Sequence, residues 1–506
     1  MKRRFIILLI ACMILLASCN VNNINNNINK PSLTICDVHV DTDDNTWCDV
    51  CGTTVIVTLD IYAINDLHGK FEDTDENPGV DELTTFLKNA KQTDELAIFL
   101  SSGDMWQGSA ESNLTRGNII TEWMNELDFV SMTLGNHEFD WGEDAIIENA
   151  EIAEFPFLAI NAYDRETNQR LSYVKASTMI EEGSVKIGVI GAIGDCYSSI
   201  APDKVTDVYF KVGKELTELV KAEAKALREQ GADVVVYSIH DGSGSSKGIT
   251  SEANSGELSS YYNVELSDGY VDVVFEGHTH QQYVMYDKHG VYHLQNGGEN
   301  KGISHVELEV NYVNNKASLN HAEFIGKGKY TSLADDPIVD TLVEKYKDEI
   351  GDVHSTLGIN PSYLSSDSLC DIVANLYYKL GVEYWGDRYS VSLGGGFLQA
   401  RSPYSLPAGE VTYADLQSIF PFDNDIVLCS VSGRDLCRRF IQTSNSSYHV
   451  SYAAGLASNI NDNATYYIVV DSYTASYAPN NLTVVASYTP GVYARDLLAD
   501  YFKNIK

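Results

Sequence analysis

Five runs of apolar, largely β-branched residues recur along the first 280 positions, and each ends in a cluster of polar side chains. The runs are TVIVTLDIYAINDLHG, LAIFLSSGD, FVSMTLGNHEFD, DVVVYSIHDG and VDVVFEGHTH. Such runs are typical of buried strands, and residues 80–91 and 212–231 between them have helical spacing. Strands that alternate with helices predict a layered α/β fold. Ligands bind at the carboxyl ends of strands in such folds, so we expect the polar clusters to converge.

The polar clusters contain seven side chains with oxygen or nitrogen donors: Asp66, His68, Asp104, Asn136, His240, His278 and His280. Seven donors exceed the need of one tetrahedral ion and suit two ions that share a carboxylate. Two metal ions a few ångströms apart can clamp a phosphoryl group and generate hydroxide at neutral pH. A single histidine of this kind is more often a core or loop residue, but five strand ends of the same character favour a metal centre. Mixed oxygen and nitrogen ligands suit zinc, manganese, iron or cobalt.

The residues and spacings of these clusters resemble the motifs of the calcineurin-type metallophosphoesterases, in the branch of the bacterial and animal 5′-nucleotidases. The blocks come in family order over about 215 residues, as Asp-x-His at 66–68, Gly-Asp at 103–104, Gly-Asn-His-Glu-Phe-Asp at 135–140, His240 and Gly-His-Thr-His at 277–280. The resemblance implies two metal sites bridged by Asp104, one with Asp66, His68 and His280, the other with Asn136, His240 and His278.

The resemblance also implies a catalytic role for His137, which follows a metal ligand without being one. Asp140 is expected to orient and charge its imidazole. The pair would then stabilise negative charge on the phosphoryl group or protonate the leaving alkoxide. The alternative is that His137 only packs. Glu138 and Phe139 are expected to be structural.

The pattern changes after residue 325. Residues 330–351 predict a helix with apolar positions at Ile338, Leu342, Val343 and Tyr346, which resembles the family's interdomain linker, and residues 368–381 predict another helix. The following segment resembles the nucleotidase C-terminal domain, through Gly394–Gly396, Gly409–Thr412, Pro421–Asn424 and Gly433–Leu436. The implied architecture is an N-terminal four-layer α/β/β/α metallophosphoesterase sandwich followed by a C-terminal α/β nucleotidase substrate-binding domain.

Three residues of the C-terminal part are expected to contact substrate. Phe422 and Asn424 match the base-stacking and base-reading positions of the family, although Phe422 could instead be a core residue. Arg401 is expected to contact a substrate anion, but it lies further from the glycines than the family's arginine. The family's second stacking aromatic follows a Gly-Gly-Asp-Gly loop that is absent here. Either Tyr473 or Tyr477 replaces it, or the base is held from one side.

The N-terminus predicts a lipoprotein signal peptide over residues 1–19. Basic residues precede an apolar run at 5–17, which is short for a membrane span, and Leu-Ala-Ser-Cys resembles a bacterial lipobox. We therefore expect acylation of Cys19, an Asn-rich tether, and a protein held by lipid on the extracellular face of the bacterial cell membrane, or secreted. No later stretch is long and apolar enough to cross a bilayer.

A small module follows the tether and completes residues 20–55. Cys36, His39, Cys48 and Cys51 have the spacing C-x2-H-x8-C-x2-C, which could close a tetrahedral structural zinc site. A disulfide with one thiol left over is the competing interpretation outside the cell. A calcium loop of Asp41, Asp43 and Asp44 is another. The remaining boundaries are predicted at 56–325 for the metallophosphoesterase domain, 326–355 for the linker and 356–506 for the C-terminal domain.

The formal net charge of −36 argues against a nucleic acid polymer or an anionic membrane surface as a partner. We expect a dimetal phosphohydrolase in which metal-activated water attacks phosphorus. Its substrates would be extracellular 5′-nucleotides, with 2′,3′-cyclic phosphates and pyrophosphates as further candidates. A phosphoesterase for a non-nucleotide ester, or a non-enzymatic surface lipoprotein on the same fold, is the alternative. The sequence does not indicate the oligomeric state.

Overall fold

The computed structural model describes residues 39–73, 78–94, 96–242, 270–287, 290–401, 404–442 and 448–505. Cys19, predicted to carry a lipid, and Cys36, predicted to bind zinc, lie outside these residues. Within the described ranges, no helix has the length and apolar character that crossing a membrane requires.

The N-terminal half is built on two six-stranded sheets. The first has the order β14-β13-β1-β2-β3-β4, with β1 to β4 parallel and β13 and β14 antiparallel to their neighbours. Its strands are β1 Ile56–Ile64, β2 Ala97–Ser101, β3 Phe129–Thr133, β4 Phe157–Leu158, β13 Gly302–Asn311 and β14 Lys316–Gly326. The second has the order β11-β12-β10-β9-β7-β6. Its strands are β6 Ser177–Glu182, β7 Val185–Ile193, β9 Val234–His240, β10 Val273–Phe275, β11 Gln282–Tyr286 and β12 Tyr292–Asn296.

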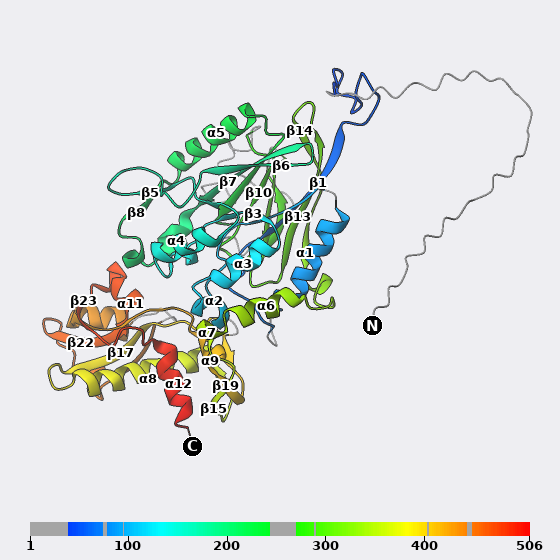
Figure 1. The fold of residues 1–506 in the computed structure, drawn as a ribbon. Coiled ribbons are helices and arrows are strands. Elements are labelled where there is room, and N and C mark those ends of the chain that lie inside the picture. Colours follow the sequence, from blue (N-terminus) through cyan, green and yellow to red (C-terminus); the bar gives the residue numbers. More distant parts are fainter. Residues whose placement is uncertain are drawn as a thin grey trace, which may run out of the picture.

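The two sheets pack face to face with helices on their outer faces (Figure 1). Side chains alternate along β1, so Leu59 and Ile61 enter the core between the sheets while Tyr62 and Ile64 pack under the helices. The helices over the first sheet are α1 Asp81–Thr93, α2 Ala110–Leu114, α3 Asn118–Glu126 and α4 Glu143–Ile152, and the second is covered by α5 Lys214–Glu229. A small pair, β5 Ala162–Asp164 and β8 Val208–Phe210, lies outside both sheets. This is the predicted four-layer α/β/β/α sandwich.

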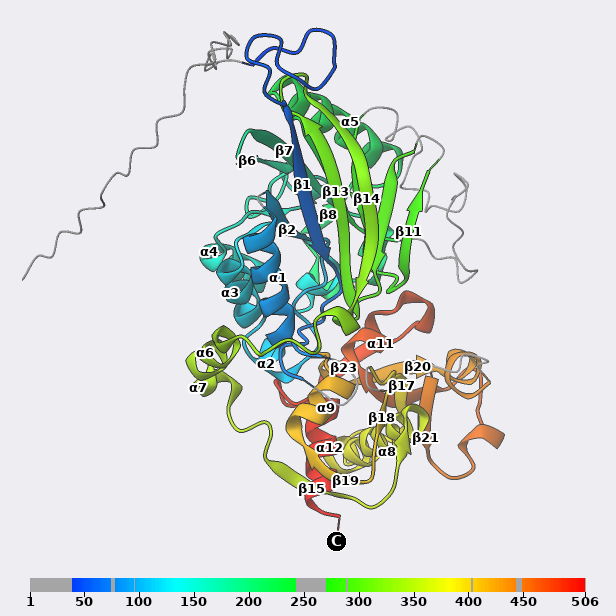
Figure 2. The ribbon, with the colours of Figure 1, turned by 90° about the vertical axis from the view of Figure 1, so that its right-hand side faces the viewer.

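The C-terminal half has a five-stranded sheet of order β21-β17-β22-β20-β23 (Figure 2). Its strands are β17 Val391–Phe397, β20 Ile426–Ser432, β21 Tyr448–Tyr452, β22 Thr465–Asp471 and β23 Thr483–Ser487. Two short pairs accompany it, β15 Thr356–Asn360 with β19 Gly409–Thr412, and β16 Leu364–Ser365 with β18 Ser405–Leu406. The helices are α8 Ser366–Trp385, α9 Tyr413–Ile419, α10 Gly433–Leu436, α11 Ser472–Ser476 and α12 Ala494–Lys503. A Cβ on Gly394 would lie 2.1 Å from the backbone nitrogen of Tyr378, so this glycine lets α8 pack onto β17.

The linker differs from the single helix predicted over residues 330–351. It contains two short helices, α6 Pro337–Lys345 and α7 Lys347–Ile350. The first begins where the Asp336 side chain accepts the backbone N–H of Ile338, with proline at the first helical position. It ends at Tyr346, whose hydroxyl donates to Glu122 Oε1 at 2.7 Å. Both helices pack into the N-terminal core through their apolar faces, so the linker belongs structurally to the first half. The exact domain boundaries stay a prediction.

Candidate metal centre and substrate pocket

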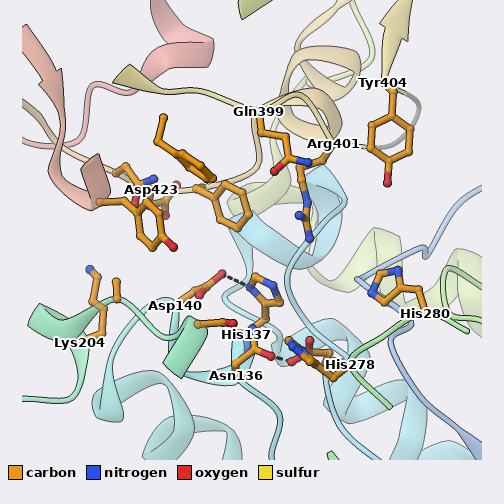
Figure 3. A pocket seen from close by; sticks show the side chains of 17 residues that line it. Asn136, His137, Asp140, Lys204, His278, His280, Gln399, Arg401, Tyr404 and Asp423 are labelled. Carbon is orange, nitrogen blue, oxygen red and sulfur yellow. Dashed lines mark hydrogen bonds and ion pairs between the residues drawn. The ribbon is translucent and has the colours of Figure 1, made fainter. Parts of the chain in front are cut away.

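The polar clusters converge at the carboxyl ends of β1, β2, β3, β9 and β10, as expected for strand ends of a layered fold. His68 Nε2 lies 3.0 Å from His280 Nε2, and His280 Nε2 lies 3.4 Å from Asp66 Oδ1. On the other side of Asp66, His240 Nε2 lies 3.0 Å from Asp104 Oδ2. Asn136 and His278 border the same space (Figure 3). All seven donors predicted from the sequence are therefore in one place.

The backbone at these positions is unusual. Asp66, His68, Asp104, His278 and His280 all have φ between 50° and 67°. Residues with a side chain adopt this left-handed region only at a cost of about 1–3 kcal/mol each, and such strain gathers at functional sites. Where the backbone turns in this way, side chains that are close in the sequence point to the same place. Along a regular strand they would point alternately to its two faces.

Steric constraints explain why three positions of the motifs are glycine. A Cβ on Gly103 would lie 2.7 Å from His240 Nδ1, and one on Gly277 would lie 2.8 Å from the same atom. A Cβ on Gly135 would lie 2.2 Å from Asp104 Oδ1. Glycine at these three positions therefore lets the ligand side chains pass close to the neighbouring backbone.

Glu138 is structural, as predicted. Its buried carboxylate accepts the backbone N–H groups of Asp104 at 2.9 Å, Met105 at 2.8 Å and Gly135 at 2.6 Å. It thus ties the loop that carries Asp104 to the loop that carries Asn136. Burial and the charge of Asp104 raise the pKa of Glu138 to about 7 against the effect of these donors.

Three buried donor atoms test whether the site fits metal ions. Asn136 Oδ1 and His278 Nδ1 have no hydrogen-bond partner among the described residues, and the contact of His240 Nε2 is the 3.0 Å ion pair with Asp104 Oδ2. Buried polar atoms normally have one. These three atoms belong to the residues that the resemblance assigns to one ion, so a cation between them would satisfy all three.

In two of the histidines, a hydrogen bond made by Nδ1 orients the imidazole ring so that Nε2 faces the metal centre. His240 Nδ1 donates to the carbonyl of Ser102 at 2.7 Å, and His68 Nδ1 donates to the carbonyl of Gln107 at 2.9 Å. Each Nε2 is left with its lone pair facing the centre, which is the usual arrangement of a metal-binding histidine. The buried carboxylates and imidazoles are consistent with the dinuclear site of metallophosphoesterases.

The protonation states of His68, His278 and Asp66 also suit ligation, whereas for His240 the charge and hydrogen bond of Asp104 outweigh burial and raise the pKa to about 10, a value that a cation at Nε2 would lower. Burial and the neighbouring His280 lower the pKa of His68 to about 3, and burial and His240 lower the pKa of His278 to about 4. Burial raises the pKa of Asp66, but His280 and His240 outweigh it and bring this pKa to about 2. Neutral imidazoles and ionised carboxylates are the forms that bind metals.

His137 and Asp140 form the predicted pair. His137 Nδ1 lies 2.8 Å from Asp140 Oδ2, and the backbone N–H of His137 donates to Asp104 Oδ1 at 2.8 Å. Burial tends to lower the pKa of His137, but the charges of Asp140 and Asp104 outweigh it, so this pKa lies above its ordinary value. The imidazole therefore favours its protonated form and faces the pocket (Figure 3).

Both halves line the pocket, a cavity of about 400 Å³. Its lining is Asp104, Asn136, His137, Asp140, Ser199, Ala201, Lys204, His278, His280, Phe397, Gln399, Arg401, Tyr404, Phe422, Asp423, Asn424 and Tyr473. Ligand pockets of proteins have volumes of about 300–1,000 Å³. The three predicted contact residues Arg401, Phe422 and Asn424 all lie in it.

Phe422 sits at the junction of the two halves. Its ring stacks on His137, with centroids 5.7 Å apart and planes at 25°, and the guanidinium of Arg401 lies 5.4 Å from its centroid. Tyr473 also lines the pocket, 6.1 Å from the ring of Phe397, whereas Tyr477 is half exposed and is not part of the lining. Of the two tyrosines considered, Tyr473 is therefore placed to act with Phe422.

Sequence reasoning missed several lining residues. Phe397 follows the glycine run directly and Gln399 shares the loop of Arg401, so their position beside a recognised motif was the available signal. Lys204 is the last residue of a short 3-10 helix, Pro202–Lys204, and no sequence motif lies beside it.

A buried arginine holds the loop of Phe422 in place. Arg495 pairs with Asp423 and donates to the carbonyl of Phe422 at 3.1 Å. Trp141 Nε1, from the N-terminal half, donates to Asp423 Oδ2 at 3.1 Å. The loop is thus positioned from both halves.

The chain is similar to known phosphoesterases. Residues 59–282 match the family described as calcineurin-like phosphoesterase. The chain is 26% identical over 424 residues to an apyrase of Tabanus yao, covering 76% of this chain and 72% of that protein. It is 24% identical over 428 residues to Protein UshA of Yersinia enterocolitica, covering 75% and 74%. The 5′-nucleotidase precursor from Thermus thermophilus has the same fold, with a TM-score of 0.64, 18% identity, and coverage of 88% of this chain and 96% of that one.

These similarities agree with the site. The matched region contains the strand ends that carry all seven donors, and the similarity extends into the half that supplies Arg401 and Phe422. They also remove the hypothesis of a non-enzymatic surface protein. Residues 59–282 therefore form a calcineurin-like phosphoesterase domain, and the chain is a metallophosphoesterase hydrolase that is similar to apyrase, Protein UshA and 5′-nucleotidase over most of its length.

Proposed function

We propose that this protein hydrolyses phosphate esters of extracellular nucleotides, with 5′-monophosphates as its first substrate class. One observation carries the proposal. Two unpartnered buried ligand atoms, Asn136 Oδ1 and His278 Nδ1, lie at one wall of a cavity whose other wall presents Phe422 and Tyr473, and His240 Nε2 lies 3.0 Å from Asp104, which also lines this cavity. The relatives named as an apyrase and as a 5′-nucleotidase support the same class.

The metal ligands are proposed in two sets. Asp66, His68 and His280 hold one divalent ion, Asn136, His240 and His278 hold the other, and Asp104 lies between them. When bound, the two ions supply positive charge for the phosphoryl oxygens and activate the attacking water. The protein's own part is to fix the donors by strained backbone and by second hydrogen bonds on the rings of His68 and His240.

His137 is proposed to hold a proton at the leaving-group side. Burial tends to lower its pKa, but the charges of Asp140 and Asp104 keep it above the ordinary value, so this imidazole holds a proton more readily than a free one. Such a group stabilises negative charge on the phosphoryl oxygens or protonates the departing alkoxide. Asp140 orients the ring through the 2.8 Å contact with Nδ1.

The C-terminal half is proposed to recognise the rest of the substrate. Phe422 and Tyr473 offer aromatic faces for a base, Asn424 offers an amide for its edge, and Arg401 offers a cation for a phosphate. Since the metal ligands come from the other half, a substrate with a base at one end and a phosphate at the other would bridge the two halves.

Residues 1–19 are proposed to direct lipidation of Cys19. The described chain begins at the end of the N-terminal half that lies away from the C-terminal half (Figure 2). A lipid upstream would therefore attach the protein from the end that lies away from the C-terminal half. Cys19→Ser should abolish lipid labelling and release the protein from membranes. Equal membrane retention of the variant, with no lipid on the wild type, would refute the anchor.

The function is tested with a panel of substrates under defined metals. Phosphate release is measured from 5′-nucleotides, 2′,3′-cyclic nucleotides, nucleoside polyphosphates and sugar phosphates, each with zinc, manganese, iron or cobalt. We expect release from the nucleotides and its loss in Asp104→Asn. Efficient hydrolysis of sugar phosphates with none of the nucleotides would assign the enzyme to another ester.

A further inference from the structure

A small module precedes the first strand, at the end of the molecule that lies away from the C-terminal half (Figure 2). Residues 39–54, called here the Cys/His module, close on themselves through an antiparallel bridge between Trp47 and Thr54. The N–H of Cys48 donates to the carbonyl of Thr53, and the N–H of Gly52 donates to the carbonyl of Cys48, both at 2.8 Å. These bonds fold the Cys-x-x-Cys segment into a tight turn.

The turn brings three metal-binding side chains together. The ligand atoms of His39, Cys48 and Cys51 lie within 4.8 Å of one another, and His39 Nδ1 lies 3.4 Å from Cys51 Sγ. Ligands of a tetrahedral zinc ion, bound at about 2.0–2.3 Å, are roughly 3.5 Å apart. We propose that His39, Cys48 and Cys51 bind a structural zinc ion, separate from the two ions of the metal centre.

The chemistry of the three donors selects zinc. Two thiolates with an imidazole form a soft ligand set that favours zinc over calcium, magnesium or manganese. Thiolate is the form that binds metal. Cys36, the fourth ligand predicted from the sequence, lies outside the described residues.

The carboxylates of the module have partners of their own, separate from His39, Cys48 and Cys51. Asp41 is buried and accepts the backbone N–H groups of Asn45 and Thr46. Asp43 accepts the side-chain amide of Asn45 at 2.9 Å, and Asp44 pairs with Lys316. Asp41 and Asp43 thus share the backbone N–H of Asn45, while Asp44 is directed to Lys316.

The module is fixed to the hairpin of β13 and β14. The side chain of Asn311 donates to Asp41 Oδ2 at 2.9 Å, and that of Asn314 donates to the carbonyl of Asp41 at 3.1 Å. The ring of His39 meets that of Tyr312 edge to face, with centroids 6.2 Å apart. A zinc ion on His39 would therefore lock the start of the chain onto the edge of the first sheet.

Cobalt substitution of the full chain provides the test. The seven donors proposed for the metal centre contain no sulfur, so a thiolate-to-cobalt charge-transfer band in the near ultraviolet would report on the Cys/His module. Cys196 requires a control, because its sulfur lies near His240 and His278 and could contribute to the band. We expect the band in the wild type, its persistence in Cys196→Ser and Cys437→Ser, and its loss in Cys48→Ser and Cys51→Ser.

Metal content and activity complete the experiment. In the zinc-loaded full chain, Cys48→Ser should hold one zinc ion per chain fewer than the Cys437→Ser control, with phosphatase activity unchanged. Activity shows that the variant has folded and that its metal centre is intact. The proposal is overturned if the wild type lacks the thiolate band, or if peptide mapping finds Cys48 and Cys51 joined in a disulfide in the protein as isolated.

Discussion

The two walls of the pocket are built by different means. The metal-centre wall is held by the backbone, with five ligand-type residues in the left-handed region and three glycines where a Cβ would collide with a ligand. The substrate wall is held by side-chain packing, with Phe422 on His137 and Arg495 under its loop. The first wall tolerates almost no change of residue type, whereas the second can be rebuilt from other aromatic and polar residues. This contrast suits an enzyme family that keeps one reaction and varies what it recognises.

Asp104→Asn should have the largest effect of the variants and tests the metal-centre wall. One carboxylate between two cations neutralises both, so we expect loss of metal together with a fall in turnover of about four orders of magnitude or more, since groups that act as a unit fail together. Metal analysis of the purified variant, beside its kinetics, measures this. Full metal occupancy with a normal rate would show that Asp104 has been wrongly assigned.

His137→Ala should separate catalysis from metal binding. We expect turnover to fall by about two to four orders of magnitude, as for the loss of a proton donor or charge-stabilising group. Both metal ions should remain, because His137 is not one of the proposed ligands. Asp140→Asn should also keep its metal and lose turnover, through the orientation and charge of the imidazole. Near-normal turnover in His137→Ala would reduce this residue to a packing role.

Phe422→Ala tests the substrate wall of the pocket. A base stacked on an aromatic ring contributes roughly 1–3 kcal/mol, which corresponds to about five- to 150-fold in affinity. The KM for a nucleoside monophosphate should therefore rise by about that factor, while hydrolysis of a small aryl phosphate stays nearly unchanged. Equal slowing of both substrates would make Phe422 a core residue. If neither changes, Tyr473→Ala becomes the informative variant.

Trp141→Phe should have the smallest effect. It keeps an aromatic ring but removes the donor that holds Asp423 from the other half. A hydrogen bond contributes about 0.5–1.5 kcal/mol net, so KM for a nucleotide should rise about two- to tenfold with turnover retained. Thermal unfolding of the variant provides the control for general destabilisation. A change in turnover without a change in KM would mean that Trp141 acts on His137 and not on the substrate loop.

The contrast between the walls also explains what the sequence could predict. The seven metal donors are fixed in identity and in spacing relative to strand ends, so their convergence followed from strand periodicity and motif. The choice between Tyr473 and Tyr477 depended on how α11 packs, which no local pattern encodes. Lys204 reaches the pocket from a turn without a motif, and the break of the linker at Tyr346 depends on its contact with Glu122. These features result from tertiary contacts, which local sequence does not specify.

The packing of α6 and α7 restricts how the two halves could move. The linker is buried in the first half as far as Val353, and β15 of the second half begins at Thr356. Any relative motion would have to pivot about His354 and Ser355, and it would have to break the 3.0 Å contact of His354 with Glu111 and the 2.8 Å bond from Asn113 to the carbonyl of Pro421. With so short a pivot, any such motion would also carry Phe422 off His137, so opening the pocket and exposing the catalytic imidazole would be one event.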